Sequence, residues 1–245
     1  MIRFLAFIWF VLGTSLFFIS GVFAFLAYKT IAFFCRNKAQ RAEFTHQYSR
    51  YWAAFLFFFY GIRFKAHAQE KVQSGGPFII VSNHQSQLDI PASALAFPKP
   101  FLFLAKKELE KVPVLGHIIK MIYLTVDRKS RHQREFKAKT ANVLKNNQSI
   151  LIFPEGTRKR NPEIILNPFY NGAFKLAIEN QTPIAVLTIV QSGQLAPANA
   201  PLLFPGKLDA YWEEVIDTQG LGRGDLDSLK ERVFELMSNR LKNNG

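Results

Sequence analysis

A histidine and an aspartate stand five residues apart in the segment VSNHQSQLDI, residues 81–90, and both side-chain types can carry proton transfer. In one regular helix this spacing turns through about 500°, so His84 and Asp89 would not share a face. They can meet if His84 lies in a loop and Asp89 in the first turn of the helix that follows. Asp89 would then accept the Nδ1–H of the imidazole and leave Nε2 free as a general base. The alternative is an ordinary loop histidine followed by an aspartate that only stabilises a helix N-terminus.

The sequence offers no obvious protein nucleophile on which such a base could act. It has no G-x-S-x-G segment, and its single cysteine, Cys35, adjoins a distant apolar segment where we expect inert packing. A single cysteine also excludes an intrachain disulfide. None of the other four histidines forms a ligand-spaced pair with His84, so we expect no metal site. We therefore expect His84 to deprotonate a substrate hydroxyl directly.

A second polar segment, FPEGTRKR at residues 153–160, has groups suited to an anion. Arg158 offers a fork-shaped donor that matches phosphate. Thr157 and the backbone N–H groups near Gly156 could add hydrogen bonds. An ordinary turn from a strand into a loop would explain Pro-Glu-Gly-Thr equally well.

Short apolar runs alternate with amphipathic stretches after about residue 63, and this alternation predicts the fold class. The expected strands are 77–83, 101–105, 121–126, 149–154 and 183–190, and the expected helices are 134–147, 171–180 and 225–242. We predict an α/β fold with a mostly parallel sheet flanked by helices. Because ligands bind at the carboxyl ends of such strands, we expect His84, Lys106, Arg128 and Arg158 to gather there.

The N-terminal part predicts a membrane anchor at residues 1–62, followed by a catalytic domain at 63–245. Residues 4–28 carry no charge and are long enough to cross a bilayer. More lysines and arginines follow this segment than precede it, which favours a cytoplasmic location for the rest of the chain. The second apolar run, 51–62, is too short to span, and it could lie in the membrane interface or be a buried helix. Two helices hairpinned into one leaflet would also fit.

The net charge of +13 suits an anionic membrane surface or an anionic substrate. The basic run 127–139 is either a solvated helix face or a contact for lipid headgroups. The aromatic residues cluster in apolar segments and are not interleaved with the basic ones, so we expect no nucleic-acid partner.

Four sequence blocks, spread over about residues 60–210, give the chain a recognisable pattern. They read SNHQSQLD, AKKELEKVPVLG…YLTVDR (105–128), FPEGTR and NGAFKLAIENQTPIAVL (171–187). In these blocks the chain resembles the 1-acylglycerol-3-phosphate acyltransferase (lysophosphatidic acid acyltransferase) family. The first and third blocks, about 70 residues apart, are the most specific part of the resemblance.

The resemblance implies a role for each matching residue. His84 would be the general base on the acceptor hydroxyl, held by Asp89, with no acyl-enzyme. The residues that would hold the glycerol phosphate acceptor are Glu155, Gly156, Thr157 and Arg158, with Lys106 and Arg128 contributing to its phosphate. The expected partners are the bilayer, a lysophospholipid acceptor and an acyl donor, either acyl-CoA or acyl carrier protein, with no other cofactor.

The sequence departs from the family pattern in two places. The second block lacks a glycine shortly before Asp127-Arg128, and Val186 stands where the family has a second proline. We predict a membrane-bound acyltransferase that makes phosphatidic acid on the cytoplasmic face. The alternatives are an acyltransferase for another lyso-lipid, such as a lyso-aminolipid, and a non-catalytic protein that binds anionic lipid.

Overall fold

The computed structural model of the chain describes all residues except 107–122, 127–132, 160, 162 and 245. Seven strands form one sheet in the order β1-β7-β6-β2-β5-β3-β4. They are β1 Ile62–His67, β2 Ile79–Ser82, β3 Phe101–Lys106, β4 Tyr123–Val126, β5 Ser149–Ile152, β6 Ile184–Val190 and β7 Gly206–Ile216. Every neighbouring pair is parallel except β6 and β7. The predicted α/β class and mostly parallel sheet are confirmed.

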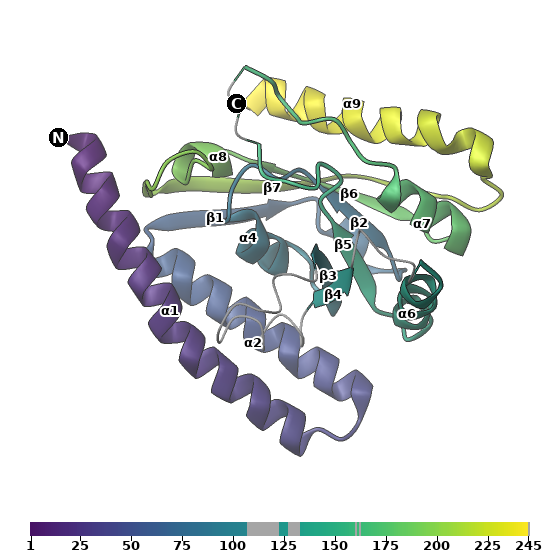
Figure 1. Cartoon of the computed structure of the whole chain (residues 1–245), viewed down its shortest axis with the longest axis horizontal. Helices are drawn as coiled ribbons and strands as arrows, with labels where there is room; N and C mark the ends of the chain where they lie inside the picture. Colours follow the sequence, from purple (N-terminus) through teal and green to yellow (C-terminus); the bar gives the residue numbers. More distant parts are fainter. Residues whose placement is uncertain (107–122, 127–132, 160, 162, 245) are drawn as a thin grey trace.

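Helices cover both faces of this sheet (Figure 1). They are α1 Ile2–Phe34, α2 Lys38–Phe59, α3 Glu70–Gln73, α4 Asp89–Ala96, α6 Gln133–Lys145, α7 Gly172–Asn180, α8 Ser192–Leu195 and α9 Leu226–Asn244, with a 3₁₀ turn at Arg223–Asp225. Helices α2 and α4 lie on one face, and α7 and α9 lie on the other.

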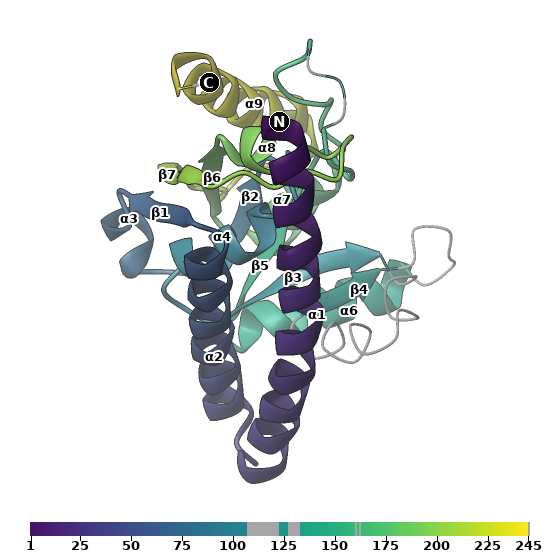
Figure 2. The same ribbon diagram turned by 90° about the vertical axis from the view of Figure 1, so that its left-hand side faces the viewer.

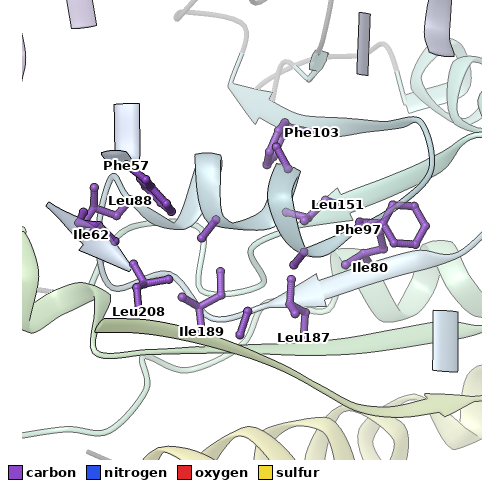
Figure 3. Close-up of a cluster of buried hydrophobic side chains, with 14 of the residues drawn as sticks. Phe57, Ile62, Ile80, Leu88, Phe97, Phe103, Leu151, Leu187, Ile189 and Leu208 are labelled. Carbon is purple, nitrogen blue, oxygen red and sulfur yellow. The ribbon is translucent and has the colours of Figure 1, made fainter. Parts of the chain in front are cut away.

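Each face of the sheet packs its own apolar core because successive strand residues point to opposite sides. In β2, Ile80 belongs to the core on the α4 side, whereas Ile79 and Val81 belong to the core on the α9 side. Figure 3 shows the α4-side core, which includes Ile80, Leu88, Phe97, Phe103, Leu151, Leu187, Ile189 and Leu208. The central strands are buried on both faces, as their continuous apolar runs predict.

All five predicted strands and all three predicted helices are present in the described residues, and two strands were missed. Strand β1 reads IRFKAH, and β7 reads GKLDAYWEEVI. Both alternate apolar with charged residues because they lie toward the edge of the sheet, where one face meets water. Strand β1 begins at Ile62, one residue inside the range predicted for the anchor.

Helices α1 and α2 form an antiparallel hairpin (Figures 1 and 2). Near the turn, the Tyr28 hydroxyl lies 2.7 Å from the Ser49 hydroxyl, and at the other end the Tyr60 hydroxyl donates to the Gly13 carbonyl. Helix α2 starts 13 residues before the predicted apolar run, because a charged stretch continues the same helix toward its N-terminal cap at Asn37. The tip of the hairpin therefore combines the charged start of α2 with two exposed phenylalanines, Phe33 and Phe34, at the end of α1.

The hairpin also packs against the part of the chain that carries the sheet. Leu203 N–H donates to the carbonyl of Ala6, and a side chain added at Gly13 would come within 2.9 Å of Leu203. Helix α2 contacts α4 through His46 Nε2 and Arg50, which both bond the carbonyl of Phe97. The outward surface of the hairpin stays apolar, with Phe4, Phe18, Phe23, Phe33 and Phe58 all more than half exposed.

Candidate active site

His84 follows β2 and is held by its backbone, its ring nitrogen and its ring face. Its N–H donates to Glu155 Oε1 at 2.6 Å, and its carbonyl accepts from Lys159 N–H at 2.8 Å. The imidazole stacks on Phe153, with 4.1 Å between ring centroids and 13° between planes. The ring remains partly open to solvent, with 15% of the side chain exposed. His84 is therefore fixed in place yet accessible from outside.

Asp89 is the first residue of α4, and its carboxylate turns back toward the histidine loop. Oδ2 accepts from His84 Nδ1 at 2.9 Å and from the backbone N–H groups of Gln85 and Ser86 at 2.7 and 2.8 Å. The predicted contact between the two side chains is thus present, and the Asp89 side chain is fully buried. A carboxylate on Nδ1 fixes the tautomer in which Nε2 carries the lone pair. The arrangement can accept a proton at Nε2 and stabilise the resulting imidazolium.

Glu155 reaches the same loop from the end of β5. One oxygen accepts from His84 N–H, and the other accepts from Asn167 N–H at 2.9 Å. The side chain is only 2% exposed, and burial raises the pKa of its carboxyl to about 7 against the lowering effect of those two N–H groups. Both oxygens are therefore already engaged within the protein. The geometry favours a carboxylate that positions His84 over one that contacts the acceptor, which is the role the resemblance implied.

Gly156, Thr157 and Arg158 form the turn that follows. Gly156 has φ of +65°, a conformation that glycine adopts readily, and its N–H closes the turn onto the carbonyl of Phe153. Thr157 is exposed and Arg158 is partly exposed, so both can reach a ligand. Lys106 ends β3, but its side chain and the whole of Arg128 lie outside the described residues. The acceptor contacts predicted for these five residues stay predictions.

The site lies at the ends of two neighbouring strands, β2 and β5, from which the chain continues to opposite faces of the sheet. Strands β2 and β5 are adjacent and parallel. The chain passes from β2 into α4 on one face, and from β5 it continues to α7 on the other. Such a switch point opens a crevice at the carboxyl ends of the two strands, and ligands bind there in open α/β sheets. His84 and the segment 153–158 follow these two strands at their carboxyl ends.

Three other residues that fix the loop were not singled out by the sequence. The amide of Asn83 exchanges two hydrogen bonds of 2.8 Å with the backbone of Ile189 in β6, and Ser86 Oγ donates to the carbonyl of Ala196. Phe153 supplies the ring under His84. The signal in the sequence was the position of these polar residues: Asn83 directly follows a fully buried strand, and Ser86 lies three residues further on. Buried polar groups of this kind need partners.

Val186 lies away from the crevice. It sits inside β6, fully buried in the α9-side core, and it is in register with Val81 of β2. Val186, where the chain departs from the family pattern, therefore belongs to the interior of a strand and does not line the site.

Comparisons with known proteins identify the family of the chain. The sequence model of the Acyltransferase family matches residues 63–190. The chain is 28% identical over 183 residues to human 1-acyl-sn-glycerol-3-phosphate acyltransferase beta, which covers 74% of this chain and 65% of that protein. It is 31% identical over 173 residues to 1-acyl-sn-glycerol-3-phosphate acyltransferase of Saccharomyces cerevisiae, covering 69% and 57%. The chain thus spans less than two thirds of the length of these curated relatives.

A solved structure has the same fold. The crystal structure of the 1-acyl-sn-glycerophosphate (LPA) acyltransferase PlsC from Thermotoga maritima superposes with a TM-score of 0.79 and 21% identity, over 98% of this chain and 95% of that one. The match includes the segments that carry His84, Asp89 and Glu155, and the family model spans the sheet from β1 to β6. This chain belongs to the acyltransferase family.

Proposed function

We propose that this protein transfers a fatty acyl group from an acyl thioester to the free hydroxyl of 1-acyl-glycerol-3-phosphate, giving phosphatidic acid. One observation carries the proposal: an accessible imidazole whose Nδ1 is held by a buried carboxylate, at the crevice between β2 and β5. The names of the relatives support the choice of acceptor. The donor is acyl-CoA or acyl carrier protein, and the reaction needs no other cofactor.

The reaction follows from the orientation of the ring. Nε2 of His84 removes the proton of the acceptor hydroxyl while that oxygen attacks the thioester carbonyl. A C–O bond forms, the C–S bond breaks, and the leaving thiolate takes the proton back from the imidazolium. Asp89 stabilises the imidazolium between these steps, so no acyl-enzyme is required. Glu155 keeps the histidine backbone at the edge of the crevice.

The acceptor phosphate is assigned to the cationic side of the crevice. Arg158 follows the Gly156 turn, and Thr157 is exposed beside it. A guanidinium binds phosphate in a bidentate manner, which fixes the position of the glycerol relative to Nε2. Lys106 and Arg128 remain candidates for the same phosphate.

We infer that the α1–α2 hairpin seats the enzyme in one leaflet, with the catalytic domain on the cytoplasmic face. By length and apolar composition α1 could cross a membrane, and it is the one described helix that could. Its first half, however, packs on the Leu203 loop of the catalytic domain through Ala6 and Gly13. An upright α1 would carry that loop into the hydrocarbon, whereas a hairpin lying in one leaflet leaves it in water. The charged first half of α2 also stays at the headgroups in this arrangement.

Transfer assays on purified protein test the proposal. Thiol release should depend on lysophosphatidic acid, and His84→Ala should abolish it while the variant still floats with liposomes. Release with a lyso-aminolipid but not with lysophosphatidic acid would overturn the acceptor assignment. Near-normal transfer by His84→Ala would remove this histidine from the mechanism. Membrane binding without transfer to any acceptor would favour a non-catalytic lipid-binding protein.

A further inference from the structure

The phenyl ring of Phe153 lies flat against the imidazole of His84. The two rings are nearly parallel, with 13° between their planes and 4.1 Å between their centroids. Pairs of aromatic side chains usually meet edge-on or well offset, with centroids about 4.5–7 Å apart. The centroids of this pair are closer together, so the imidazole covers the face of the phenyl ring.

The surroundings of Phe153 hold its ring in this position. The residue directly follows β5, and its carbonyl accepts the N–H of Gly156 at 3.0 Å, which closes the turn that comes next. Its side chain packs against the α4-side core. There the ring of Phe103 lies stacked on it, with 6.5 Å between centroids and 23° between planes, and Figure 3 shows Phe103 in that core. The backbone turn and the core together keep the phenyl ring under the histidine.

The charge of His84 changes during the proposed reaction, and the face of a phenyl ring responds to that charge. The π electrons make the face negative, so it attracts a cation that lies within about 6 Å of the ring centroid. An imidazolium gains this attraction, whereas a neutral imidazole gains little of it. Water weakens the attraction only in part, because 15% of the His84 side chain is exposed and Phe153 is half-buried. The stacked ring therefore favours the protonated histidine over the neutral one.

The charged groups around His84 leave a place for such a contribution. From α4, the carboxylate of Asp89 bonds Nδ1, and from the end of β5, Glu155 accepts the backbone N–H. The described cationic side chains of the turn that follows are Arg158 and Lys159. The ammonium group of the second bonds a backbone carbonyl in its own loop, and the loop after β6 has no ionisable side chain. Among the described residues, Asp89 is the one carboxylate bonded to the imidazole, and the face of Phe153 is a second group placed to stabilise positive charge on it.

We propose that Phe153 is a positioning residue that acts through His84, by stabilising the imidazolium that forms as the acceptor hydroxyl loses its proton. The inference rests on the proposed function, in which Nε2 of His84 takes up that proton. Asp89 stabilises the charge at Nδ1, and Phe153 stabilises it from the face of the ring. Neither contact occupies Nε2, where the acceptor is bound.

Replacing Phe153 by mono-, di- and trifluorophenylalanine tests this role with little change in the shape of the side chain. Each fluorine withdraws electrons from the ring face and weakens its attraction for a cation, whereas the apolar packing is kept. At neutral pH we expect kcat/KM for the acceptor to fall stepwise along the series, by about 5- to 10-fold for the trifluoro ring. The Tm should stay unchanged, and the KM for the acceptor should change less than about twofold.

The pH dependence separates this role from a purely structural one. At high pH the resting histidine is neutral, so the ring face stabilises only the transition state and the loss should be complete. At low pH the resting histidine already carries the proton, so the stabilisation cancels and the variants should converge on the wild type. Glu155 titrates alike in the wild type and in every variant, so it does not alter the comparison. A loss of the same size at every pH, or no loss along the series, would overturn the proposal.

Phe78 provides the matched control. It belongs to the same α4-side core but precedes β2, so it lies at the opposite end of that strand from His84. Trifluorophenylalanine at position 78 should leave kcat/KM unchanged at every pH. A loss equal to that at position 153 would mean that fluorination acts through the core as a whole, which would also overturn the proposal.

NMR of the imidazole follows proton uptake by His84 without any substrate, so it separates the two levels of inference. His84→Ala identifies the signal among the five histidines. With trifluorophenylalanine at position 153, the midpoint of proton uptake should move to lower pH by about 0.7–1. A lowered midpoint in a protein that never acylates lysophosphatidic acid would refute the proposed function and keep the role of Phe153. Normal acylation, with an unmoved midpoint and no loss along the series, would refute the role of Phe153 alone.

Discussion

Replacing Glu155 by glutamine should disturb catalysis through the position of His84 and leave acceptor binding intact. Each carboxylate oxygen accepts one backbone N–H, from His84 at 2.6 Å and from Asn167 at 2.9 Å. A glutamine side chain has one acceptor oxygen, so in either orientation its NH₂ group faces a backbone N–H. That backbone N–H loses its acceptor, and the NH₂ group of the glutamine is a second buried donor without a partner.

The magnitude follows from these two contacts. A buried donor that is left without an acceptor costs about 1–3 kcal/mol. With two such donors we expect Glu155→Gln to lower the free energy of unfolding by about 2–6 kcal/mol, which for a chain of this size lowers the Tm by about 4–24 °C. A histidine loop displaced by a fraction of an ångström should lower kcat about 10- to 100-fold. The KM for lysophosphatidic acid should change less than about twofold.

Steady-state kinetics and thermal unfolding check this prediction together. Glu163→Gln is the matched control, since Glu163 is an exposed carboxylate in the same loop, and it should leave the Tm, kcat and KM unchanged. The reasoning fails if Glu155→Gln keeps the Tm and kcat but raises the KM for the acceptor 10-fold. That result would place Glu155 on the acceptor, as the resemblance implied.

Three further variants probe the groups around His84 and the hairpin. Asp89→Asn should keep the fold but lower kcat by about 10³-fold, because a neutral amide cannot stabilise the imidazolium; a loss below 10-fold would contradict the general-base pair. Asn83→Ala removes two hydrogen bonds to β6 and should lower stability by about 2 kcal/mol in denaturant unfolding. Burial, with Arg50 nearby, lowers the pKa of His46 from 6.5 to about 4. The unfolded chain therefore binds a proton that the folded chain refuses, and stability should fall by up to about 3 kcal/mol as the pH drops from 6.5 toward 4. His46→Leu should lose this part of the pH dependence, and an unchanged pH profile of the Tm would refute it.

The central strands could be predicted from the sequence because they are buried on both faces. Runs such as SILI in β5 need no partner to be recognised as apolar and short. Strands β1 and β7 could not be found in the same way, because IRFKAH exposes alternate residues to water. Their pairing is also non-local, since Ile62 lies beside Gly206. Only the assembled sheet shows that these two segments belong together.

The part of the candidate site that could be predicted is the part whose residues are close together in the sequence. A loop histidine and an aspartate at the start of the next helix are brought together by the backbone between them, and the two N–H groups that Asp89 accepts come from the same short segment. The contact between Glu155 and His84 depends instead on β5 lying beside β2. The sequence contains no signal of that adjacency, and the acceptor contact that the resemblance implies for Glu155 stays a prediction.

The adjacency of β2 and β5 also explains why the blocks SNHQSQLD and FPEGTR can lie far apart in the sequence. Strands β3 and β4 are inserted between β2 and β5 in the chain but lie outside β5 in the sheet. The number of residues between His84 and Glu155 can therefore vary without moving either side chain, as long as β5 returns to pair with β2. The hydrogen bond from His84 N–H to Glu155 extends the strand pairing by one more contact, beyond the point where the ladder ends at Val81 and Ile152. Any change that loosens the end of this ladder should therefore lower kcat before it lowers affinity for either substrate.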